Sequence, residues 1–207
     1  VVVGINTRMI YLLYDDGSRS EKVILNELGG CKGIIQSDGY SPYRKLESDA
    51  YPHITRIPCL QHIKRKFIDC GEDEPDAKRI VELINTLYQN EHKHKIGVDG
   101  WTVEQNLVHR KKYAPDILGE IKDVLDDIEE RGDLLPKSEL KEAVTYLRNE
   151  WNAVVDIFNY GDTYLDNNIV ERMNRYISLS RKNSLFFGSH KGAERGAILY
   201  TIALTCR

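Results

Sequence analysis

Residues 166–175 read Asp-Asn-Asn-Ile-Val-Glu-Arg-Met-Asn-Arg. Their apolar members predict an amphipathic helix, because Ile169, Met173 and Ile177 recur at intervals of four residues and so share one face. Thr163 stands three residues before the first Asp, which is the spacing of a capping box and predicts that the helix begins there. The sequence therefore predicts a helix with one buried stripe close to the carboxyl end of the chain.

The same helix has a second face of polar residues. Asn167, Glu171 and Arg175 recur at intervals of four, so a carboxylate lies between an amide and a guanidinium. As a purely structural feature, this is a solvated face with one Glu–Arg pair that contributes a few tenths of a kcal/mol, about 0.2–0.5. The alternative is a functional carboxylate, and the helix alone leaves both interpretations open.

A second carboxylate follows a predicted strand. Residues 33–37 are short and apolar enough for a central strand, and Asp38-Gly39 comes directly after them. Open α/β sheets bind ligands outside the carboxyl ends of their strands, which favours a functional role for Asp38. Asp-Gly is also a common turn pair, so a purely structural turn is the alternative.

Three blocks of the chain, in order, resemble the insertion-sequence-66 family of DDE transposases. The blocks are Gln36-Ser37-Asp38-Gly39-Tyr40-x-x-Tyr43, then Cys59-x-x-His62-x-x-Arg65-Lys66-Phe67, then Asp166-Asn167-Asn168-x-x-Glu171-Arg172 followed by Ser180-Arg181-Lys182-Asn183-x-Leu185-Phe186-x-Gly188-Ser189. The likeness runs from about residue 11 to residue 207. The usual Arg-Pro and Gly-Arg-Lys-Asn of the family are replaced here by Arg175-Tyr176 and Ser180-Arg181-Lys182-Asn183, which suggests a subgroup.

This resemblance implies a metal-dependent transposase that cuts DNA at the ends of an insertion sequence and transfers the cut strands. Asp38 and Glu171 would be the second and third catalytic carboxylates and would bind metal. Two Mg²⁺ or Mn²⁺ ions, about 3.5–4 Å apart, are expected in such a site. In the family the first catalytic Asp lies upstream of the first hairpin, so we expect it outside this chain, and we expect the isolated fragment to be inactive or nearly so.

Several basic residues are candidates for contact with DNA phosphates. The net charge of −3 does not fit a uniformly basic nucleic-acid binder, but residues 162–207 hold seven basic side chains against four acidic ones. Solvated helix faces are the structural alternative. The predicted DNA-binding residues are Lys64, Arg65, Lys66, Arg172, Arg175, Arg181, Lys182 and Lys191.

The resemblance implies an α/β fold, with a ribonuclease-H-like core and a large all-helical insertion before the last catalytic helix. Residues 1–68 would form the first part of the core, with its first strand missing, and begin with a hairpin of residues 1–5 and 9–14. Further strands are predicted over residues 33–37 and 54–59. Residues 69–160 would form the insertion, and residues 161–207 the last part of the core with the Glu helix and a basic tail. Gly and Pro residues at the breaks predict insertion helices over 76–90, 102–113, 116–131 and 138–158, with a break at Pro115. Apolar residues of the last helix recur every three or four positions and predict a buried stripe, made of Leu140, Val144, Leu147, Trp151, Val154, Val155 and Phe158.

Composition excludes some classes of protein. No run of about 18 apolar residues is present, so no membrane span is predicted. The four cysteines include no C-x-x-C pair, which indicates reduced cytosolic thiols, and Cys59 and His62 lack a second ligand pair for zinc. The resemblance implies that the cytoplasm is that of a bacterium.

Double-stranded DNA, further copies of the chain and accessory proteins of the same element are the predicted partners, and association with the nucleoid is expected. Two rival functions remain open: a non-catalytic DNA-binding or dimerisation module, and a ribonuclease-H-like nuclease. Metal dependence would separate the first rival from a transposase, and strand transfer would separate the second.

Overall fold

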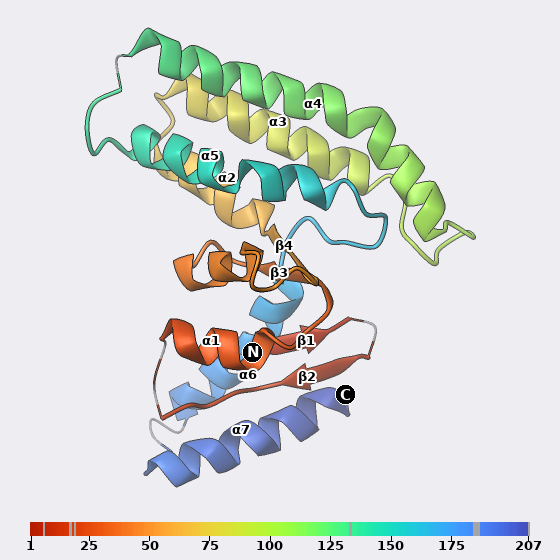
Figure 1. The fold of residues 1–207 in the computed structure, drawn as a ribbon, viewed down its shortest axis with the longest axis vertical. Helices are drawn as coiled ribbons and strands as arrows, with labels where there is room; N and C mark the ends of the chain where they lie inside the picture. Colours follow the sequence, from red (N-terminus) through yellow and green to blue (C-terminus); the bar gives the residue numbers. More distant parts are fainter. Residues whose placement is uncertain (6, 17, 19, 133, 184–186, 207) are drawn as a thin grey trace. The chain divides into compact units, whose positions relative to one another are not determined.

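The computed structural model is a mixed α/β structure in which helices predominate (Figure 1). It describes the chain except residues 6, 17, 19, 133, 184–186 and 207, and it describes only the backbone of residues 180–183. Two compact units form, one from Val1–Cys31 together with Asn167–Arg207, the other from Lys32–Asp166. We refer to these as the terminal unit and the central unit, and each is described by itself.

The terminal unit is built on a hairpin. Strands β1 (Val2–Gly4) and β2 (Met9–Tyr11) pair antiparallel, as predicted. The helices of this unit are α1 (Glu21–Leu28), α6 (Asn168–Asn183) and α7 (His190–Thr205). Two threonines on successive turns of α7 accept hydrogen bonds from the β2 segment. Thr205 Oγ1 accepts from Ile10 N and Thr201 Oγ1 accepts from Leu12 N, each at 3.0 Å.

The core of the terminal unit confirms most of the predicted buried stripe of α6. Met173 and Ile177, together with Tyr176, pack against a small buried cluster formed by Ile10, Leu12 and Leu204. Ile169, in the first turn, is 39% exposed and does not belong to this cluster. The stripe therefore begins one turn later than its spacing predicts.

The start of α6 differs from the prediction. The helix begins at Asn168, and the Asn167 carbonyl accepts its first hydrogen bonds, from Val170 N at 2.9 Å and Glu171 N at 3.3 Å. Thr163 does not cap it. Its buried hydroxyl accepts a hydrogen bond from Arg110 at 2.6 Å and donates one to the Ile157 carbonyl at 2.8 Å. The predicted capping box is wrong because a buried guanidinium, distant in the sequence, binds this hydroxyl.

The central unit contains a parallel pair of strands. Strand β3 (Gly33–Ser37) pairs with β4 (Ile54–Pro58), and the connection between them includes a short 3₁₀ helix, η1 (Ser41–Glu47). Both strands lie where the sequence predicts them. The register places Ser37 opposite Pro58, so both strands end at the same edge.

Four helices complete the central unit: α2 (Leu60–Asp69), α3 (Pro75–Glu91), α4 (Val103–Arg131) and α5 (Glu139–Ile157). Helix α3 lies beside α4, and α2 beside α5 (Figure 1). A single core includes Ile63, Phe67, Ile84, Leu125 and Leu147. The predicted helices of residues 76–90 and 138–158 are thereby confirmed to within two residues at each end.

The predicted break at Pro115 is wrong. Helix α4 continues through Pro115, and Figure 1 shows that it bends along its length. Proline removes one backbone hydrogen bond and bends a helix without necessarily ending it. Three residues next to the exposed proline are buried: Ala114, Ile117 and Leu118. Their packing stabilises the helix on both sides of the missing hydrogen bond.

The compact units differ from the three predicted segments. Strands β3 and β4 and helix α2 group with residues 69–160, because α2 packs on α3 and α5 and because β4 packs on α5. None of the described helices is long and apolar enough to cross a membrane.

Candidate active site

Asp38 follows β3 at the edge where both parallel strands end. It is half-buried, and its Oδ1 accepts a hydrogen bond from Tyr40 N at 3.2 Å, so the carboxylate folds back over its own turn. Ser37 is buried, and its hydroxyl donates to the Asp38 carbonyl at 2.9 Å. This is a position at which parallel sheets commonly place ligand-binding groups.

An ion cluster with a buried Arg56–Glu150 centre and two partly exposed members supports this edge from the side of β4. Arg56 on β4 donates from Nη2 to Glu150 Oε2 on α5 and from Nε to Glu47 Oε1 on η1. Arg44 donates to the other oxygen of Glu150 at 2.8 Å. Arg56 Nη1 lies 3.4 Å from the Ser37 hydroxyl, which it reaches as a donor. The cluster therefore joins two secondary-structure elements and a 3₁₀ helix to the residue before Asp38.

The charge of Arg56 is well stabilised. Burial lowers its pKa, but the hydrogen bonds and negative charges of Glu150 and Glu47 outweigh burial, and the net pKa is raised above the ordinary value. Buried charges are tolerated when they are paired and hydrogen-bonded, and both conditions hold for the Arg56 and Glu150 side chains.

Tyr146 on α5 covers the turn next to Asp38. A Cβ atom at Gly39 would lie 1.8 Å from the Tyr146 hydroxyl oxygen, so the phenol occupies the space that any larger residue at 39 would need. Burial, then the charges of Glu150 and Asp38, raise the pKa of Tyr146 to about 12. The hydroxyl is therefore uncharged at neutral pH.

The three predicted basic residues of α2 have different surroundings. Arg65 and Lys66 are exposed, and Lys66 Nζ lies 6.0 Å from the centroid of the Tyr146 ring. Lys64 is half-buried, donates to Asn85 Oδ1 at 3.1 Å and lies over the Tyr88 ring. The structure thus places Lys66 beside the tyrosine that covers the Asp38 turn, whereas the Lys64 amine binds within the protein.

The predicted residues near the carboxyl end belong to the terminal unit. Glu171 is half-buried in the first turn of α6, and Arg172 and Arg175 are exposed on the same helix. Lys191 is exposed in the first turn of α7. The side chains of Arg181 and Lys182 lie outside the described residues. The structure therefore brings Glu171 together with two of the predicted arginines on one helix.

A metal site needs ligand atoms of the right chemistry that also lie close together. Carboxylate oxygens are the donors that Mg²⁺ and Mn²⁺ prefer, so Asp38 and Glu171 are suitable in type. In the described part of the chain, no three His, Cys, Asp or Glu side chains group closely enough to hold an ion. Cys59 is buried directly before α2 and does not belong to such a group among the described residues either.

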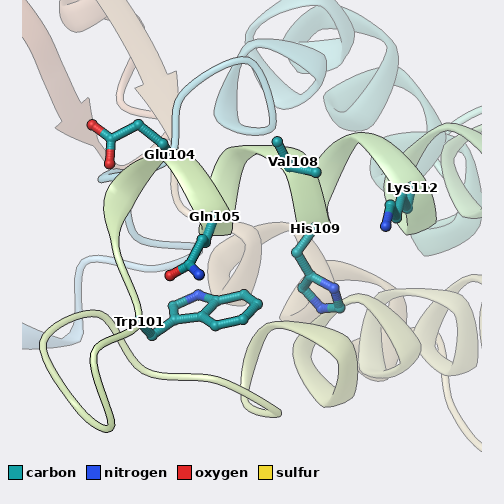
Figure 2. A pocket seen from close by; sticks show the side chains of 6 residues that line it. All are labelled: Trp101, Glu104, Gln105, Val108, His109 and Lys112. Carbon is teal, nitrogen blue, oxygen red and sulfur yellow. The ribbon is translucent and has the colours of Figure 1, made fainter.

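A shallow hollow of about 370 Å³ lies at the amino end of α4 (Figure 2). The indole of Trp101 forms one wall, and Gln105 and His109 project toward it from the first turns of the helix (Figure 2). His94 stacks on Trp101 with the ring centroids 3.8 Å apart. None of these residues is among the site residues predicted from the sequence, and the lining of the hollow includes no group of the Asp38 edge.

Hydrogen bonds from two polar side chains, Arg110 and Gln36, fix the segment that follows α5. Arg110 is fully buried and donates to the carbonyls of Ile157 (3.2 Å) and Thr163 (2.7 Å) while pairing with Glu91. Gln36, two residues before Asp38, donates to the Tyr164 carbonyl at 2.8 Å. The segment before Asp166 is therefore held by β3 as well as by α4.

Comparisons with known proteins place these residues in a family. The family profile described as "Transposase IS66 family" matches residues 3–195. The chain belongs to this transposase family. Its matched range contains both predicted carboxylates and the ion cluster of Arg56 and Glu150. Family membership supports a transposase-related function in nucleic-acid processing.

The curated relatives of this family member come from Sinorhizobium fredii. Uncharacterized protein y4jD is 30% identical over 89% of the chain and 36% of its own length. Uncharacterized protein y4hP is 27% identical over 95% of the chain and 37% of its own length. Uncharacterized protein y4qI is 28% identical over 99% of the chain and 38% of its own length. The chain thus spans little more than a third of these relatives, and no solved structure matches it.

Sequence reasoning missed the ion cluster and the covering tyrosine. A signal for the cluster was present, because Glu150 lies one turn after Leu147 beside the predicted apolar stripe and Arg56 lies between Ile54 and Ile57 in a predicted strand. Charged residues at core positions indicate a buried partner. No comparable signal marks Tyr146, whose contact with Gly39 depends on the packing of α5.

Proposed function

We propose that this chain is the catalytic domain of a DDE-type DNA transposase with a ribonuclease-H-like core, which cuts and joins DNA at the ends of an insertion sequence. The observation that carries the proposal is Asp38 at the carboxyl end of β3, within a chain that the family profile matches over residues 3–195. Parallel strand ends hold catalytic groups in α/β folds, which supports this role for Asp38. Residues 69–160 would be a helical insertion into that core.

Asp38 and Glu171 would hold Mg²⁺ or Mn²⁺. When bound, two such ions activate the attacking oxygen and stabilise the leaving oxygen of a phosphodiester displacement. Asp38 suits this role because its strand, its turn and the buried Ser37 fix its backbone. Glu171 suits it because a helix fixes its backbone and its side chain is only half-exposed.

The basic residues would bind DNA phosphates. Arg65, Lys66, Arg172, Arg175 and Lys191 are exposed, as phosphate contacts require. We extend the proposal to Arg181 and Lys182 on the basis of the sequence alone, and to Lys64 as a weaker contributor, because its amine binds Asn85. Double-stranded DNA, further copies of the chain and accessory proteins of the element are the proposed partners.

The test is cleavage and strand transfer by the full-length protein with Mg²⁺ and a DNA carrying the element ends. Asp38→Asn and Glu171→Gln should each lower the cleavage rate by about 1,000-fold or more, because a metal site supplies several kcal/mol of transition-state stabilisation. Asp49→Asn and Glu194→Gln, two exposed carboxylates, are the matched controls and should retain cleavage.

Three outcomes would contradict the proposal. Cleavage that survives Asp38→Asn would remove Asp38 from the site. Cleavage without strand transfer to a target duplex would favour a nuclease of the same fold. Mg²⁺ that changes neither DNA affinity nor thermal stability, in a protein that does not cut, would favour a non-catalytic DNA-binding module.

A further inference from the structure

Two residues of helix α5, one helical turn apart, connect the helix to the Asp38 turn, one by direct contact and the other through intervening side chains. Tyr146 and Glu150 are spaced at i and i+4, so they lie on the same face of the helix. Val144, Leu147 and Val154 of the same helix are buried in the apolar core. The face of α5 that reaches the turn is thus partly polar, whereas its neighbouring positions are apolar.

Glu150 reaches Asp38 through two side chains. Both of its oxygens are occupied, one by Arg44 and the other by Arg56. Arg56 then reaches the Ser37 hydroxyl, which donates to the Asp38 carbonyl at 2.9 Å. A carboxylate with a fully buried side chain on α5 therefore determines where the Arg56 guanidinium next to Ser37 lies.

Tyr146 contacts the other side of the turn. Its hydroxyl oxygen fills the position that a Cβ of residue 39 would take, so it lies directly against the backbone that follows Asp38. Oriented groups behind a metal ligand set its position, and their removal commonly lowers metal affinity or activity by about 10–100-fold.

We infer that Glu150 and Tyr146 are positioning residues for Asp38, so that helix α5 forms part of the catalytic centre and is not only packing. This inference rests on the proposed function, in which Asp38 binds metal. It assigns to α5 the task of holding the Ser37–Asp38–Gly39 backbone from both sides, with Glu150 acting through Arg56 and Tyr146 acting by direct contact. Removing either group should loosen the turn before any metal binds.

The first measurement needs no activity. In the metal-free full-length protein, hydrogen exchange of a peptide spanning residues 34–43 should rise about tenfold or more in Glu150→Gln, and less in Tyr146→Phe. Val154→Ala is the matched control, because Val154 is buried on the same helix and lies in the apolar core. Its exchange should rise around residue 154 and stay unchanged at residues 34–43.

The second measurement uses metal and DNA. Glu150→Gln should raise the Mg²⁺ concentration for half-maximal cleavage and lower the maximal rate by about 10–100-fold. Its affinity for DNA without metal should not change. The double variant Arg56→Met, Glu150→Met removes the pair without leaving one charge alone, so it should fold more stably than Glu150→Gln and keep the raised Mg²⁺ requirement.

The outcomes separate this inference from the proposed function. One outcome would overturn the inference alone. In it, Glu150→Gln has the same hydrogen exchange at residues 34–43 and the same Mg²⁺ requirement as Val154→Ala, while Asp38→Asn abolishes cleavage. If Asp38→Asn retains cleavage, the proposed function is wrong as well. A double variant with a normal Mg²⁺ requirement would show that the pair serves stability alone, and would also overturn the inference.

Discussion

Arg56 on β4 and Glu150 on α5 form an ion pair in which neither side chain is exposed to solvent. The two residues are 94 positions apart in the sequence. Losing one member of such a buried pair costs about 3–5 kcal/mol, because the other charge stays buried without its partner. The strand pair and the long helices are therefore joined by a charge interaction as well as by apolar packing.

Gly161 should tolerate no side chain. A Cβ there would lie 2.1 Å from the Val103 carbonyl oxygen, which is backbone and cannot rotate away. We expect Gly161→Ala to lower the free energy of unfolding by about 1–3 kcal/mol, as overpacking does. Urea unfolding of the full-length protein measures this change.

Gly119 provides the matched control. It lies inside α4, and a Cβ added there meets no atom within 4 Å. Gly119→Ala should raise the stability by about 0.5–1 kcal/mol, because alanine loses less backbone entropy in a helix. Equal effects of the two substitutions would show that the Val103 contact is not what excludes a side chain at 161.

Glu91 should make stability depend on pH in the acidic range. Burial raises its pKa, but hydrogen bonds and the charge of Arg110 outweigh burial and bring the net pKa below the ordinary 4.5. A lowered pKa contributes stability that is complete above pH 4.5 and is lost as the pH falls through the folded-state value. Glu91→Gln should lower the free energy of unfolding by about 3 kcal/mol at pH 7. The difference in free energy of unfolding between this variant and the unaltered protein should become smaller below pH 4.5.

Urea unfolding between pH 7 and pH 3 tests this dependence. Glu120→Gln is the control, since Glu120 pairs with Arg79 on the surface and should contribute at most about 1 kcal/mol. If the stability difference between Glu91→Gln and the unaltered protein stays constant down to pH 3, the pKa of Glu91 is not lowered.

The basic residues of α2 should divide into two classes. Lys66→Ala should weaken DNA binding and reduce the slope of log affinity against log salt by about one, as the loss of one phosphate contact does. Lys64→Ala should leave that slope nearly unchanged and cost about 1 kcal/mol of stability, because its amine binds Asn85. DNA titrations at several salt concentrations, with the exposed Lys122→Ala as control, distinguish these effects. Equal slopes for all three variants would remove Lys66 from the DNA surface.

Pro115 should be a destabilising residue. It lies inside α4, where a proline removes a hydrogen bond, and its side chain is exposed. We expect Pro115→Ala to raise the free energy of unfolding by about 1–3 kcal/mol, after allowing for the greater freedom of the unfolded chain. The neighbouring exposed Asp116→Ala should change it by no more than about 0.5 kcal/mol. A less stable Pro115→Ala protein would mean that the bend itself supports the packing of α4.

Local patterns predicted much of the fold. The strands at 33–37 and 54–58 and the position of Asp38 follow from short apolar runs with turn residues after them. The spacing of apolar residues also predicted the buried stripe of α5, whose members Leu140, Val144 and Val154 are buried. These features depend on neighbours in the sequence, so spacing alone reveals them.

Contacts between distant residues account for the errors. Thr163 has the spacing of a helix cap, but Arg110, 53 residues away, binds its hydroxyl. Pro115 would end an isolated helix, but burial of residues on both sides of it continues α4. The support of Asp38 by Glu150 crosses more than a hundred positions, and no local pattern carries that information.

The Arg56–Glu150 pair also limits how this domain can be recombined or engineered. A helical block transplanted from a relative would bring a new residue to position 150, while residues 44, 47 and 56 would remain from the recipient. Unless residues 56 and 150 match, the chimaera would bury an unbalanced charge, because both of these side chains are shielded from solvent. Exchanges between relatives should therefore succeed when the crossover points keep these residues from the same parent. The set of chimaeras that fold would then identify the residues of the cluster without a structure of any hybrid.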